Sequence, residues 1–204
     1  MLLALDTSRH TGWAVGPAGS TPLWGVEDLG RQSTGHVIAN MRRLLWRLLQ
    51  THRPTFVCFE SPYFPRPGGR IPMNALTLRR LMGLTATVEG FCAELNIDCR
   101  EATPLEIAHF FLGTSRPMNR EAKKLATMEM CRQFGWAVDN DNCADALALW
   151  AMAEAKLDPA AATRRGEGPL FIPKTNRPGV VSSEPAIAAT DHQGANPWPV
   201  RSIM

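Results

Sequence analysis

The apolar residues of this chain fall into two kinds of pattern. Two short runs, at residues 2–5 and 55–59, are almost free of polar side chains, and each is followed by an acid. Such runs are typical of strands that are buried on both faces of a sheet. Residues 12–16 follow the first run after one tight turn, and residues 21–26 have the composition of a third strand. The opening of the chain is therefore expected to form a small antiparallel meander.

Longer segments show helical periodicity. In residues 35–51 the apolar side chains fall on one helical face and the arginines on the other, which predicts an amphipathic helix. Further helices are expected over residues 74–95, 104–111, 119–134 and 142–156, with a short strand over 97–100 and Asn119 as a helix cap. This order of elements predicts an α/β fold in which a mixed central sheet is flanked by helices.

The composition changes after residue 157. Pro, Ala, Gly, Thr and Ser dominate from there on, and the periodicity disappears. We therefore expect residues 1–157 to form one domain and residues 158–204 to be a disordered tail. No internal repeat is visible, which argues against a solenoid.

The overall composition is that of a soluble globular protein, with 45% hydrophobic and 20% charged residues. A formal charge of +3 permits a polyanionic partner without requiring one. The five cysteines have no metal-binding spacing, and no apolar segment is long enough to span a membrane. We therefore expect a cytoplasmic protein with reduced thiols and no membrane contact.

Three carboxylates stand at positions that predict burial. Asp6 and Glu60 end the two apolar strands, and Asp145 lies on the apolar stripe of the last helix, three and four residues before Ala148 and Leu149. A buried acid is unfavourable unless something pairs with it. One acid at a strand end is usually a cap or a turn residue, but three acids on separate core elements predict a common site.

Asp141 and Asn142 lie about one turn before Asp145 on the same helix. One interpretation makes either residue the N-cap, with acids of the first turn answering the helix dipole. The other places them beside the three carboxylates. Carboxylates that converge from two strands and a helix can hold magnesium, which prefers oxygen ligands. A pair of such ions about 4 Å apart can activate water for phosphodiester hydrolysis.

Three segments resemble the motifs of one nuclease family. Residues 4–8 and 11–15, ALDTS and TGWAV, resemble the first-strand motif of RuvC-like Holliday junction resolvases, especially small phage-type members. Residues 57–62, VCFESP, resemble the second acidic strand of these enzymes, and residues 142–149, NCADALAL, resemble their C-terminal helix. The resemblance covers residues 1 to about 157.

The resemblance implies an RNase H-like fold, a homodimer, and magnesium-dependent paired nicking of four-way DNA junctions, with manganese able to substitute. Asp6, Glu60 and Asp145 match the catalytic metal ligands of the family. At the fourth ligand position, where the family has Asp or His, this chain has Asn142. The neighbouring Asp141 is therefore the preferred fourth carboxylate, with Asn142 as a helper ligand through its carbonyl oxygen.

Basic residues gather near the start of the helix at 119–134. They are Arg116, Arg120, Lys123 and Lys124, of which the last three share one helical face. The simplest interpretation is a solvated basic face. Because no acid on that face of the helix answers the three charges, the alternative is contact with DNA phosphates, which would make binding fall steeply with salt.

The loop that follows Glu60 combines aromatic and basic residues, namely Tyr63, Phe64, Arg66 and Arg70. One interpretation is a surface turn whose rings pack back onto the domain. In RuvC-like resolvases an aromatic residue soon after the strand acid inserts at the centre of the junction, and Tyr63 or Phe64 matches that placement. An inserted ring can stack on an exposed base.

Three further residues lie near these motifs. Arg79 and Arg80 are candidates for the same cleft, for a dimer interface or for a plain solvent-exposed face. His10 stands close to Asp6, and we expect it to be a turn residue.

The favoured function is a structure-selective DNA endonuclease acting on branched DNA. A second hypothesis is an RNase H-like or YqgF-like nuclease acting on RNA or RNA–DNA hybrids, which would use the same metal site. A third is a binding module that grips branched DNA without cutting it, and Asn142 is the feature that favours it. An actin-like ATPase is disfavoured, because that fold needs two domains and a Gly-rich phosphate turn after the first acid.

Overall fold

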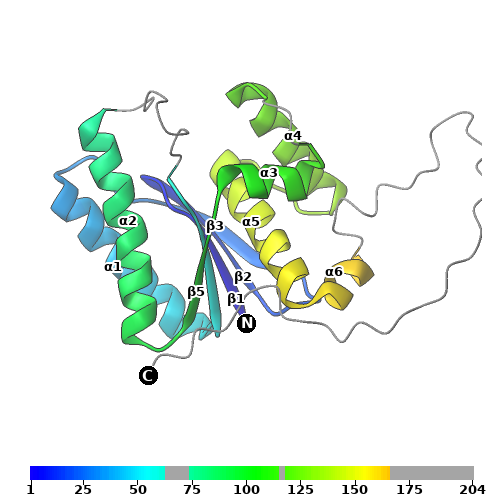
Figure 1. The fold of residues 1–204 in the computed structure, drawn as a ribbon, viewed down its shortest axis with the longest axis horizontal. Helices are drawn as coiled ribbons and strands as arrows, with labels where there is room; N and C mark the ends of the chain where they lie inside the picture. Colours follow the sequence, from blue (N-terminus) through cyan, green and yellow to red (C-terminus); the bar gives the residue numbers. More distant parts are fainter. Residues whose placement is uncertain (63–73, 115–117, 166–204) are drawn as a thin grey trace, which may run out of the picture.

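The computed structural model describes residues 1–62, 74–114 and 118–165 (Figure 1). One sheet lies at the centre, with two helices on one face and the remaining helices on the other (Figure 1). The predicted α/β architecture with a mixed sheet and flanking helices is confirmed.

The sheet has five strands in the order β3-β2-β1-β4-β5. The strands are β1 (Leu2–Asp6), β2 (His10–Gly16), β3 (Leu23–Asp28), β4 (Phe56–Glu60) and β5 (Asp98–Ala102). The first three form the predicted antiparallel meander, and β4 and β5 run parallel to β1. Because Leu5 pairs with Phe59, the acids that end β1 and β4 leave the same edge of the sheet side by side.

The predicted helices are present with bounds close to those expected. They are α1 (Thr34–His52), α2 (Ala75–Glu94), α3 (Pro104–Leu112), α4 (Arg120–Gln133) and α5 (Asp141–Leu157). A short helix, α6 (Pro159–Arg165), continues past the expected domain boundary and packs on α5. Among the described helices, none combines the length and hydropathy that a membrane crossing requires.

Two cores form because successive side chains of a strand point to opposite faces of the sheet. Leu3 and Leu5 pack with α1 and α2, whereas Leu2 and Ala4 pack with the helices of the other face. That second core is rich in alanine, which lets α5 lie close to the sheet.

Helix α5 lies directly against the sheet at Gly12. This residue pairs with Asp6 across the first two strands, and a Cβ atom added to it would stand 2.0 Å from the carbonyl oxygen of Asn142. No side chain fits in that space. The absence of a side chain at Gly12 therefore places the first turn of α5 against the end of β1.

We predict that Gly12→Ala lowers the free energy of unfolding by about 1–3 kcal/mol, because the backbone of α5 must move to admit the methyl group. Gly90→Ala is the matched control, since a Cβ atom there meets nothing within 4 Å. In the interior of α2 that change is expected to stabilise the protein by about 0.5–1 kcal/mol. Denaturant unfolding of the three proteins measures both effects, and equal stabilities for the two variants would refute the close-approach argument.

Candidate carboxylate site at the ends of β1 and β4

The site is built on the ends of two adjacent parallel strands. Asp6 is the last residue of β1 and Glu60 the last residue of β4. The buried Thr7 hydroxyl donates a hydrogen bond of 2.9 Å to the carbonyl oxygen of Glu60, which ties the two ends together. Asp145 is contributed by α5, which packs across β1 and β2.

The electrostatics show that these three acids are close together. Burial raises the pKa of Asp6 well above its usual value, and the charges of Glu60 and Asp145 raise it further. Burial is also the main cause that raises the pKa of Glu60 to about 7, with a further contribution from Asp145. The pKa of Asp145 is raised by burial and by the charge of Asp141.

A single cation counteracts this repulsion at all three acids. The charge of Lys123, from the first half of α4, lowers the pKa values of Asp6, Glu60 and Asp145. Lys123 belongs to the basic face for which the sequence showed no partner. Its partners come from other elements of the fold.

Asp141 is held differently from the three acids. Its carboxylate forms an ion pair with Lys124 of α4, and hydrogen bonding to that ammonium lowers the pKa of Asp141. The expectation that no acid answers the basic face is therefore wrong for Lys124, because the acid approaches from a neighbouring helix.

Neither Asp141 nor Asn142 is the N-cap of α5. That residue is Asn140, whose side-chain oxygen accepts a bond of 2.8 Å from the backbone N–H of Asn142. The Asn142 side chain also donates to the same oxygen, at 3.0 Å. The N-cap interpretation is therefore wrong by one residue for Asp141 and by two for Asn142, and Asp141 lies in the first turn.

A cavity of about 210 Å³ opens between these elements. It is lined by Asp6, Ser8, Arg120, Lys123, Lys124, Asp141, Asn142 and Asp145. Acidic and basic side chains thus line the same cavity. Glu60 is not among the lining residues, but its charge raises the pKa of Asp6. Ser8 is a lining residue that the sequence analysis missed, because a turn serine carries no signal of its own.

The oxygen donors fit a hard divalent cation, since they are carboxylate and amide oxygens. Asp6, Glu60 and Asp145 would hold such an ion, with Asp141 or Asn142 beside them. Within residues 1–62, 74–114 and 118–165, no three side chains of His, Cys, Asp or Glu are already gathered as metal ligands.

Tyr63, Phe64, Arg66, Arg70 and Arg116 lie outside the described residues.

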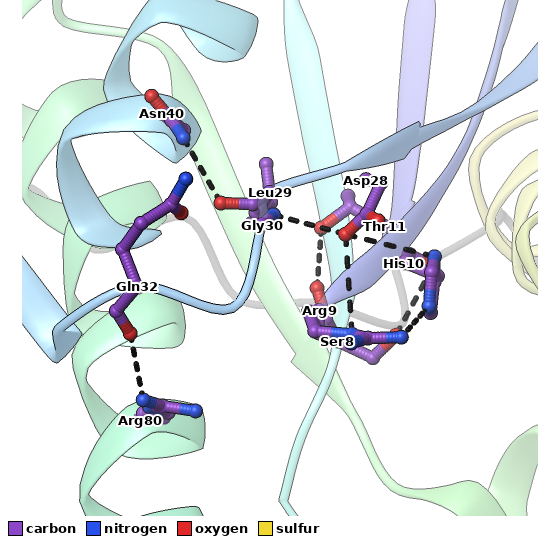
Figure 2. A network of polar contacts seen from close by, with 10 residues as sticks. All are labelled: Ser8, Arg9, His10, Thr11, Asp28, Leu29, Gly30, Gln32, Asn40 and Arg80. Carbon is purple, nitrogen blue, oxygen red and sulfur yellow. Dashed lines mark hydrogen bonds and ion pairs between the residues drawn. The ribbon is translucent and has the colours of Figure 1, made fainter. Parts of the chain in front are cut away.

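Three residues near the sequence motifs have defined positions. The expectation that His10 is a turn residue is wrong, because His10 is the first residue of β2. Its ring lies 3.8 Å from the Asp28 carboxylate (Figure 2), and it is not among the residues that line the carboxylate cavity. On α2, Arg79 is exposed, whereas Arg80 lines a different cavity.

We predict that the free energy of unfolding in EDTA falls as pH rises from about 4 to about 7. The folded protein retains protons on these carboxyls that the unfolded chain has already released, so stability is greatest below the unfolded pKa values and is lost as Glu60 ionises near 7. In Glu60→Gln the decrease in the free energy of unfolding over this pH range should be smaller by on the order of 1–3 kcal/mol. Glu129→Gln, on the exposed side of α4, should leave it unchanged. Identical pH slopes in all three proteins would contradict the raised pKa values.

Comparison with protein-family models found no match, and comparison with curated protein sequences found none. Among solved structures the chain is similar to RuvC from Thermus thermophilus, with a TM-score of 0.58 and 17% identity over 82% of this chain and 97% of that one. The structure titled T. thermophilus RuvC in complex with Holliday junction substrate gives a TM-score of 0.56 and 16% identity, over 82% and 96% of the chains. The yeast mitochondrial Holliday junction resolvase Ydc2 gives 0.47 and 14% identity, over 80% and 83%.

The two RuvC structures decide the fold. The match covers 97% and 96% of the RuvC chains. The resemblance first read from three sequence motifs is therefore supported by the three-dimensional arrangement, and the chain has the RNase H-like fold of RuvC.

Proposed function

We propose that this protein is a magnesium-dependent endonuclease that nicks branched DNA, and four-way junctions above all. The observation that carries the proposal is the set of three buried acids Asp6, Glu60 and Asp145, whose pKa values are raised by burial and by neighbouring acids, with Asp6 and Asp145 lining one cavity. Perturbed acids in a cavity are a recognised sign of a functional site. The RuvC of similar fold, solved in complex with Holliday junction substrate, supports the choice of DNA.

Each side chain has a chemical role in this proposal. Asp6, Glu60 and Asp145 hold the divalent ions, which when bound activate water and stabilise the leaving oxygen. Before the ions bind, the charge of Lys123 stabilises the ionised forms of these carboxylates and so lowers their pKa values.

The basic residues at the mouth of the cavity orient the substrate. Arg120 and Lys124 line the same cavity as the acids and can contact the phosphates that flank the reacting one. Tyr63 or Phe64 would stack at the junction centre, and Arg66, Arg70 and Arg116 would add phosphate contacts. Two copies of the chain in a homodimer would bring one such site to each of two strands, which paired nicking requires.

The chain is expected to cut a synthetic four-way junction in magnesium, and Asp6→Asn is expected to slow cutting by about a thousandfold or more. Loss of a metal ligand removes several kcal/mol of transition-state stabilisation. Asp98→Asn, at the exposed start of β5, is the control for the lost charge and should cut normally. The measurement is the single-turnover rate on labelled junctions, with magnesium and then manganese.

The same assay separates the alternatives. Faster cutting of an RNA–DNA hybrid than of the junction would favour the RNase H-like hypothesis. Tight junction binding without cutting in either metal would favour the non-cleaving module and contradict our proposal.

A second prediction concerns the fourth ligand. We propose that Asp141 leaves Lys124 and completes the metal site, so Asp141→Asn should raise the magnesium concentration needed for half-maximal cutting by about tenfold, within the range seen when groups that support a metal are lost. Asn142→Ala should change it much less, because that side chain is already bonded to Asn140. The reverse order would identify Asn142 as the ligand.

A further inference from the structure

A second basic cavity lies on the other side of the turn that follows Asp6. Its volume is about 220 Å³, and it is lined by Arg9, Val37, Thr77, Arg80, Leu81 and Leu84. Two arginines thus face a space whose remaining lining is mostly aliphatic. None of these six residues belongs to the carboxylate cavity.

The charge of Arg80 is held without a carboxylate. Its guanidinium donates to the carbonyl oxygen of Gln32 at 2.8 Å (Figure 2). It also donates to the Thr34 hydroxyl at 3.5 Å. Both acceptors are neutral, and within the described part of the chain Arg80 takes part in no ion pair. A guanidinium has five N–H donors. Arg80 is therefore fixed in place, retains its full charge and keeps donors for an anion.

Arg9 is also held by its surroundings. Its backbone carbonyl accepts from the N–H of Leu29 at 2.8 Å, and its guanidinium lies 3.9 Å from the Asp28 carboxylate. Asp28 is itself engaged by the N–H of Gly30 at 2.9 Å (Figure 2). One exposed acid at this distance neutralises Arg9 only weakly. The cavity therefore has a net positive charge on a rigid frame.

The two cavities are adjacent along the chain. Ser8 lines the carboxylate cavity and Arg9, the next residue, lines the second one. Consecutive Cα atoms are about 3.8 Å apart, and a DNA strand carries one phosphate per about 3.4 Å of helix axis. A strand with one phosphate at the acids thus reaches the second cavity within a few nucleotides.

We propose that the cavity between Arg9 and Arg80 is a subsite for a DNA backbone phosphate near the one that is cut. The guanidinium groups bind the phosphate oxygens with paired N–H donors. The aliphatic floor formed by Val37, Leu81 and Leu84 receives the sugar. This inference rests on the proposed action on DNA, but it concerns binding and does not require cutting.

The test measures junction binding in the Asp6→Asn background, where the substrate stays intact. Adding Arg80→Gln should weaken binding by about tenfold, the loss expected for a charge-assisted hydrogen bond, and should lower the salt slope by about one. Arg9→Gln should act in the same direction. Arg132→Gln removes an equal charge from the exposed end of α4, on the other face of the sheet, and should change neither quantity.

A junction with single neutral methylphosphonates separates phosphate binding from a purely structural role of Arg80. One position should weaken binding when neutralised, and that effect should disappear once Arg80→Gln is present. If every neutral position acts equally with and without Arg80→Gln and Arg9→Gln, the subsite does not exist.

The outcomes also separate this inference from the proposed function. If the wild-type protein cuts junctions but Arg80→Gln and Arg9→Gln both bind DNA as tightly as the Asp6→Asn parent, only the subsite is overturned. Failure of the wild type to cut, with a phosphate effect that depends on Arg80, would overturn only the proposed nuclease function.

Discussion

Repulsion among Asp6, Glu60 and Asp145 is the constraint on which the rest of this structure depends. Burial alone would favour their neutral forms, the charges of Glu60 and Asp145 raise the pKa of Asp6 further, and the charge of Asp145 raises that of Glu60. The fold nevertheless holds them together through the hydrogen bond of Thr7 and the contact of α5 with Gly12. A protein that needed only stability would gain by replacing these acids. Under the proposed function, bound cations would offset this repulsion.

Basic residues line two cavities that meet the turn after Asp6, the first through Ser8 and the second through Arg9. On one side Arg120, Lys123 and Lys124 of α4 share the cavity with the acids. On the other side Arg9 and Arg80 line a second cavity. Figure 2 shows Asp28 and Leu29 beside Arg9, which contacts both residues. The carboxylates thus lie between two positively charged surfaces, an arrangement that suits a polyanion passing across the turn.

Most of the fold could be predicted from the sequence because its signals are local. Apolar runs and helical periodicity placed the strands and helices, and the acids at strand ends and on the α5 stripe marked the site. The ion pair between Lys124 and Asp141 could not be predicted, since it depends on how two helices pack. Arg80 is a similar case, because its partners Gln32 and Thr34 are more than forty residues away in sequence. Helix α6 carries too short a pattern to stand out from the Ala-rich segment around it.

Calorimetric titration of the metal-free protein with Mg²⁺ and Mn²⁺ at pH 6.5, in two buffers of different ionisation enthalpy, tests the central claim most directly. At this pH Glu60, with its pKa raised to about 7, still holds much of its proton. A cation bound by the carboxylates must therefore displace protons. We predict saturable binding with net proton release in the wild-type protein, and neither in Asp6→Asn. Absence of saturable binding, or equal binding by the variant, would contradict the account.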